Sequence, residues 1–188
     1  MSRKESILAI ARTILVEEGH HRLTMRRLTE KVGIKLASLQ YHYPTKNALI
    51  GVLIEKSVQT YHHIMLDLIR SIRSEETDGG IGRLFAIYQD EMESGIFEQL
   101  WALSVQDPEL KQQYDELYLT FWDSVTAEME LFDPHASESD WRSRAAMVIA
   151  LLDGLETFIG AEGLKHKLPL DLQTQVINQI RIIAQGGP

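Results

Sequence analysis

The side chains best suited to chemistry lie in a short stretch around residue 40. The Gln40 amide can form two hydrogen bonds with the edge of an adenine base, and Leu36 or Ala37 could touch a thymine methyl group. Lys46 adds a cation a few residues later. The hydrogen-bonding side chains suited to phosphate oxygens are Ser38, Tyr41 and His42. These types and spacings favour contact with nucleic acid.

A short exposed helix must position these groups, and the flanking residues predict one. One helix is expected to follow Thr24, a good N-cap, and to stop at Gly33. A second, about Leu36 to His42, is delimited by Pro44. The residues expected to face the core from this second helix are Leu39 and Tyr43. Helix, tight glycine turn and helix form the helix-turn-helix pattern, in which the second helix enters the major groove.

The remaining sequence is also periodic in the helical sense, so the predicted fold class is all-α. A first helix is expected from Ser2 to Glu18 and a long amphipathic helix from Thr45 to about Ile72. Further helices are predicted near 81–93, 96–104, 107–130, 139–163 and 171–185. We expect residues 1–48 to form a helix-turn-helix domain and residues 49–188 a ligand-binding and dimerisation domain.

Charge is divided unevenly along the chain. Of a net charge of −8, residues 1–50 carry nine Lys and Arg against four acids, and the other residues are strongly acidic. A cationic segment can neutralise phosphates, while an acidic remainder keeps the other surfaces off DNA. The sequence has no cysteine, no run of eighteen apolar residues and a charged first segment, so we expect a cytoplasmic protein that does not enter the membrane.

The stretch from Leu23 to Leu49, LTMRRLTEKVGIKLASLQYHYPTKNAL, closely resembles the DNA-binding signature of the TetR (tetracycline-repressor) family of dimeric regulators. The resemblance implies a double-stranded DNA operator as partner. By position, it implies phosphate contacts from Thr24, Ser38, Tyr41, His42 and Lys46. It implies base contacts from Arg26, Leu36, Ala37 and Gln40.

Two positions depart from the family pattern. Lys35 replaces the common Ser or Thr cap of the recognition helix, and Gln40 stands where Tyr is frequent. Lys35 should cap the helix less well but adds positive charge at the groove. Gln40 is expected to exchange a phosphate contact for base readout.

Two further groups of aromatic residues either fill a core or line a ligand pocket. One group lies on a single predicted helix and includes Tyr114, Tyr118, Phe121, Trp122 and Val125. The second group consists of Phe85, Tyr88, Met92, Phe97 and Trp101. The resemblance implies a small, largely apolar effector between the long helix and the central helices. The candidate pocket residues are Tyr61, Met65, Tyr88, Trp101, Tyr118 and Trp122.

The last two predicted helices carry more small and apolar residues than one core can absorb. They either complete a monomeric core or form a symmetric four-helix interface, and the resemblance favours a homodimer. No catalytic motif, cofactor motif or metal-ligand spacing is present, and His62-His63 has no partner at the next helical turn. We therefore expect a ligand-responsive repressor that is not an enzyme and needs no cofactor. An architectural DNA-binding protein and an apolar-ligand carrier are the alternatives.

Overall fold

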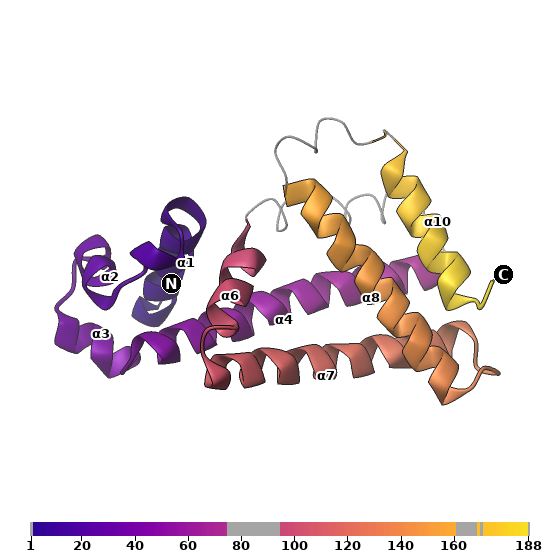
Figure 1. Ribbon diagram of the computed structural model, residues 1–188, viewed down its shortest axis with the longest axis horizontal. Coiled ribbons are helices and arrows are strands. Elements are labelled where there is room, and N and C mark those ends of the chain that lie inside the picture. The colour runs from indigo at the N-terminus through magenta and orange to yellow at the C-terminus, as the bar shows by residue number, and fades with distance from the viewer. Residues whose placement is uncertain (1, 75–94, 161–168, 170, 188) are drawn as a thin grey trace. The chain divides into compact units, whose positions relative to one another are not determined.

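The computed structural model describes residues 2–74, 95–160, 169 and 171–187, and every regular element in these ranges is helical (Figure 1). The helices are α1 (Arg3–Glu18), η1 (His20–Arg22), α2 (Met25–Val32), α3 (Leu36–His42), α4 (Lys46–Arg73), α6 (Ile96–Ser104), α7 (Pro108–Phe132), α8 (Glu138–Gly160) and α10 (Leu172–Ala184). The all-α prediction is confirmed. The helix predicted near 81–93 lies outside the described residues.

The chain forms two compact units. Unit 1 comprises Met1–Gln59 and Gly95–Leu117, and unit 2 comprises Thr60–Ser94 and Tyr118–Pro188. Helices α4 and α7 each contribute their first part to unit 1 and the rest to unit 2. The boundary expected after residue 48 between a DNA-binding and a ligand-binding domain stays a prediction. The two compact units are defined by contacts between residues and not by their function.

Local capping signals define the N-terminal helices of unit 1. The Ser2 amide donates to the Glu5 carboxylate (2.6 Å) and the Glu5 amide donates to the Ser2 hydroxyl (3.2 Å), a capping box that starts α1. The Thr24 hydroxyl accepts a hydrogen bond from the Arg27 amide (3.1 Å) and starts α2. Gly33 ends α2 with φ 72°, a left-handed conformation that glycine adopts without a steric penalty.

The core of unit 1 packs α1 against α2 and α6, and α2 against α3. Leu39 and Tyr43 are buried, as their helical spacing predicts. On α2, Leu28 and Thr29 are buried, whereas Met25 and Val32 are half-buried. An eight-residue helix is too short to bury a full stripe, so its end residues remain partly open.

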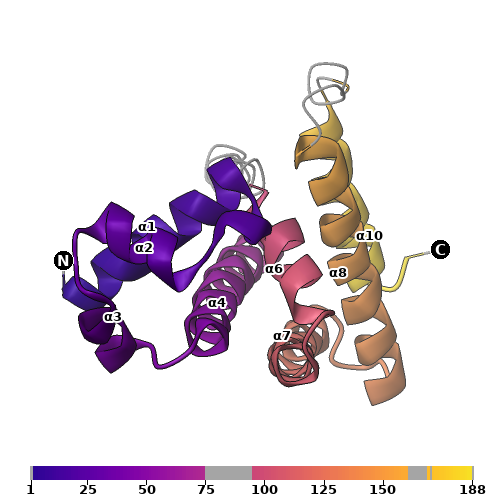
Figure 2. The same ribbon diagram turned by 60° about the vertical axis from the view of Figure 1, so that its left-hand side comes forward.

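In unit 2, helices α8 and α10 pack side by side (Figure 2). Ala145, Val148 and Leu152 of α8 are buried, as are Ile180 and Ala184 of α10. None of the helices within the described ranges is long and apolar enough to span a membrane.

Candidate nucleic-acid interface

Helix α3 presents a mostly exposed surface. Leu36, Ala37, Gln40 and Tyr41 are exposed, with Tyr41 at 85% and Leu36 at 48% of full exposure. Ser38 and His42 of the same helix are half-buried. Leu39 anchors the opposite face in the core, so the helix turns its polar and small side chains to solvent. A helix with this surface can approach a groove closely.

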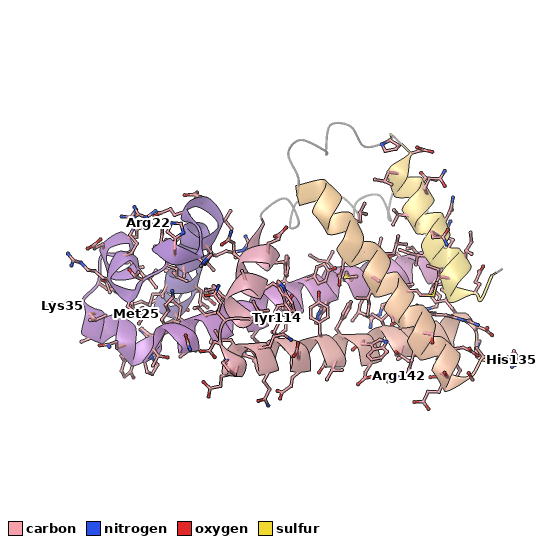
Figure 3. All side chains as sticks on the ribbon, viewed as in Figure 1. Arg22, Met25, Lys35, Tyr114, His135 and Arg142 are labelled. Carbon is pink, nitrogen blue, oxygen red and sulfur yellow. The ribbon has the colours of Figure 1, made fainter. Side chains whose placement is uncertain are left out.

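Lys35 lies at the N-cap of α3, at the outer edge of the α2–α3 turn (Figure 3). Its backbone is extended (φ −74°, ψ 151°), and its side chain makes no capping hydrogen bond. Its carbonyl accepts from the amides of Ser38 (3.0 Å) and Leu39 (3.2 Å). The ammonium group is therefore exposed beside the α3 surface, and the cap position lacks the oxygen that a Ser or Thr would supply.

Thr24 and Arg26 are exposed at the start of α2. The Thr24 hydroxyl uses an oxygen lone pair to cap the helix, which leaves its proton available for donation to an acceptor. The Arg26 guanidinium pairs with Glu30 one turn along α2 (3.1 Å), with 90% of the Arg26 side chain exposed. An exposed pair of this kind is weak, so Arg26 can exchange Glu30 for another partner.

Lys46 opens α4 and is half-buried. Within the ranges that the structure describes, its ammonium has no ion pair. The adjacent Thr45 hydroxyl accepts from the Ala48 amide (3.0 Å), which fixes the start of α4. The positive charge of Lys46 is therefore held on an ordered turn.

A carboxylate that the sequence did not single out organises several cations of the segment. The Glu18 carboxylate lies 2.6 Å from Lys31, 3.0 Å from Arg27 and 4.0 Å from Arg22. The hydrogen bond from Lys31 and then that from Arg27 lower the pKa of Glu18. These cations have an internal partner, whereas the Lys35 and Lys46 ammonium groups have none among the residues described.

Side-chain amides also join the N-terminal helices to α6 and α7 within unit 1. Gln99 of α6 accepts a hydrogen bond from the His20 amide (3.1 Å). Gln113 of α7 donates to the Gly51 carbonyl of α4 (3.1 Å). A methyl group at Gly51 would come within 2.7 Å of the Gln113 side-chain oxygen, so glycine permits this approach. Sequence periodicity could not reveal these pairs, because their members lie more than sixty positions apart.

The candidate ligand residues fall into several environments. In unit 2, the hydroxyls of Tyr61 and Tyr118 both donate to Asp153 of α8, a residue that the sequence did not point to. Trp122 instead donates its indole N–H to the Arg142 carbonyl (2.9 Å), and the Arg142 guanidinium lies over its ring. Met65 is fully buried in unit 2, and Trp101 packs edge-on against Tyr114 in unit 1. Tyr88 lies outside the described residues. The pocket stays a prediction.

The N-terminal helices match a known protein family. Residues 7–53 fit the family model described as bacterial regulatory proteins, tetR family. This match covers 47 of the 188 residues of the chain and contains α2 and α3. The nucleoid occlusion factor SlmA of Photorhabdus laumondii is 38% identical over 55 residues, which cover 29% of this chain and 28% of that protein. The tetracycline repressor protein class C of Escherichia coli is 32% identical over 60 residues, which cover 32% of this chain and 27% of that protein.

Solved structures share the TetR-family fold over nearly the whole length. A protein of Mesorhizobium loti described as a TetR-family transcriptional regulator matches with a TM-score of 0.69 and 14% identity, covering 98% of this chain and 94% of its own. The multidrug binding protein EbrR, complexed with malachite green, matches with a TM-score of 0.69 and 16% identity, covering 97% and 98%. At such identities these likenesses show the fold. The matches to the two curated relatives span less than a third of their lengths, so the activities of those whole proteins do not follow for this chain.

Proposed function

We propose that this protein is a ligand-responsive transcriptional repressor of the TetR family. A homodimer binds a palindromic DNA operator through α3, and a small, largely apolar effector releases it. The observation that carries the proposal is the solvent-facing side of α3, where Gln40 and Tyr41 are exposed beside the Lys35 ammonium group. The Gln40 amide and the Lys35 ammonium group are the kinds of donor that contact base edges and phosphates.

The groups of this surface divide naturally into two roles. Lys35 and Lys46 supply positive charge for phosphates, which gives affinity without sequence preference. Gln40 supplies a paired donor and acceptor, which discriminates adenine from other bases in the major groove. Thr24 and Arg26 extend the contacts on the α2 side.

Dimerisation through α8 and α10 is supported by apolar surface that unit 2 leaves uncovered. Met147 of α8 and Ile182 of α10 are 56% and 43% exposed. An apolar groove of about 470 Å³ runs along the same two helices, lined by Ala150, Leu151, Gly154, Leu155, Pro169, Leu172 and Val176. A second copy of these helices would cover both features with a self-complementary interface.

Release by the effector rests on helix α4, which supplies residues to both units. A ligand that binds unit 2 differently in the free and the operator-bound dimer must shift the balance between them. By linkage, the operator must then lower effector affinity by the same factor. The protein would reside in the cytoplasm with its DNA.

The test is a mobility-shift assay with the DNA that flanks the gene for this chain. We expect retarded bands whose affinity falls steeply with salt. Gln40→Ala should weaken binding to that DNA but not to unrelated DNA. Lys56→Ala is the matched control, because Lys56 is an exposed cation of unit 1 outside α2 and α3 and should leave binding nearly unchanged.

Two results would count against the proposal. Equal affinity for the flanking DNA and for unrelated DNA, with Gln40→Ala affecting both alike, would favour an architectural DNA-binding protein. An absence of binding to any DNA would leave the exposed surface of α3 without a role and would favour a carrier of apolar ligands.

A further inference from the structure

Asp153 occupies an unusual place in unit 2. It lies on α8, and its carboxylate accepts hydrogen bonds from the hydroxyl of Tyr61 on α4 and from that of Tyr118 on α7 (3.3 Å). Burial raises the pKa of Asp153, and the two tyrosine hydrogen bonds oppose that effect. Asp153 and Tyr118 are nevertheless half-buried and not fully enclosed.

The rings of the two tyrosines pack against those of His62 and Phe121. His62 stacks on Phe121 with ring centroids 3.9 Å apart and planes 8° apart. The Tyr118 ring lies edge-on to the His62 ring with centroids 5.7 Å apart, and the centroids of the Tyr61 and Phe121 rings are 6.2 Å apart. Rings with electron-rich faces attract cations, most strongly where water is partly excluded.

The cluster contains no positive charge of its own. Burial lowers the pKa of His62 to about 4, so this imidazole is neutral near pH 7. Its Nε2 atom is buried and has no hydrogen-bond partner among the described residues. In the part of the chain that the structure describes, no Lys or Arg pairs with Asp153. The only partners of its carboxylate there are the two hydroxyls.

Two other carboxylates of unit 2 form ion pairs with arginine side chains. Buried Glu128 lies 2.7 Å from the Arg70 guanidinium and 3.5 Å from that of Arg73. Asp133 lies 2.9 Å from Arg144. The fold thus provides guanidinium groups for those carboxylates and provides neutral donors for Asp153. A partly buried carboxylate without a counterion is costly, so binding a cation there is favourable.

From this contrast we propose that Asp153 is the counterion for a positively charged effector. The ligand class is an organic ammonium or delocalised cation with apolar substituents, whose charge pairs with Asp153 and whose apolar groups contact the half-buried rings of His62 and Tyr118. The inference rests on the proposed effector-binding role of unit 2 and specifies the charge of the effector.

The experiment measures binding of matched probes to the full chain by calorimetry. Tetraphenylphosphonium and tetraphenylborate have nearly the same size and shape but opposite charge. Choline and its uncharged carbon analogue, with tert-butyl in place of trimethylammonium, form a smaller pair. We expect at least one of the two cations to bind about tenfold or more tightly than its partner. Asp153→Asn should abolish that preference, because the amide keeps a hydrogen-bond acceptor but loses the charge.

Asp123→Asn is the control, since it removes one exposed negative charge from α7 of the same unit. It should leave the preference for cations unchanged. If Asp153→Asn retains the preference, or if neither cation binds more tightly than its partner, the assignment of Asp153 is wrong. Should Asp153→Asn fail to fold, the comparison of probes on the unaltered chain decides alone.

Operator binding is measured separately by mobility shift without any probe. If the chain does not shift the DNA that flanks its gene, the repressor function is rejected, whatever the affinities for the probes are. Normal DNA binding without a preference for cations would reject the assignment of Asp153 and leave the repressor function standing. The two failures are therefore distinguishable.

Discussion

Replacing Lys35 with serine should change stability and DNA affinity in opposite directions. The N-cap of α3 already has the extended backbone that a capping serine adopts (φ −74°, ψ 151°), and no side-chain oxygen occupies it. A serine hydroxyl there could accept from the amide of Ala37 or Ser38. Such a cap adds about 1 kcal/mol to the free energy of unfolding. For a chain of this size the thermal midpoint should rise by roughly 2–4 °C.

The same substitution removes an exposed ammonium group from the DNA-facing surface. If each Lys35 of the proposed homodimer neutralises one phosphate, the slope of log K against log salt should flatten by about 1.8 in the variant, about 0.9 for each of the two contacts. Lys35→Ala is the matched control, because it removes the charge without adding a cap. Both variants should show the flatter slope in a mobility-shift titration over a range of salt concentrations. Only Lys35→Ser should show the higher midpoint in calorimetry.

Two results would refute this reasoning. Equal thermal midpoints for Lys35→Ser and Lys35→Ala would mean that a serine hydroxyl at the start of α3 gives no stabilisation. Unchanged slopes in both variants would remove Lys35 from the phosphate-binding residues, and the charge at the groove would then come from other side chains.

Three further predictions concern other parts of the chain. In mobility shifts, Lys46→Ala should weaken binding to all DNA about equally, whereas Gln40→Ala should cost about 1–3 kcal/mol of binding free energy at particular base pairs only. The same pattern of affinity loss across DNA sequences for both variants would contradict their separate roles. In urea unfolding, Arg70→Ala should lower the free energy of unfolding by about 1–3 kcal/mol, and by more than Glu128→Gln does. Arg70→Ala removes a partner from the buried Glu128 carboxylate, whereas Glu128→Gln leaves two guanidinium groups that water can hydrate. The reverse order of the two losses would contradict this. The lowered pKa of Glu18 stabilises the fold above its unfolded pKa of about 4.5, so the stability gap to Glu18→Gln should shrink as pH falls below that value; a gap constant with pH would exclude the ion pairs as its source.

Local chemistry allowed the N-terminal half of the fold to be predicted. Thr24, Gly33 and Pro44 act on their immediate neighbours, through a cap, a left-handed turn and a missing amide hydrogen. The predicted helix ends therefore lie close to the observed ends of α2 and α3. The exposed side of α3 followed from periodicity, because Leu39 and Tyr43 had to face inward.

Helical periodicity also predicted a shared aromatic face on α7 but could not assign its partners. In the structure Tyr114 pairs with Trp101, Tyr118 donates to Asp153, and Trp122 lies under Arg142. Periodicity fixes the direction in which a side chain leaves its own helix and carries no information about which other helix it meets.

The sequence by itself therefore determined the helices, the helix-turn-helix and its exposed surface, because each depends on residues within a few positions of one another. Only the tertiary structure brought Asp153 to Tyr61, 92 positions away, and His20 to Gln99, 79 positions away. The charge state of a carboxylate depends on whether burial or a nearby cation dominates its surroundings, and both come from distant segments. For that reason Asp153 looked like an ordinary helical acid in the sequence and stands out only in the folded unit.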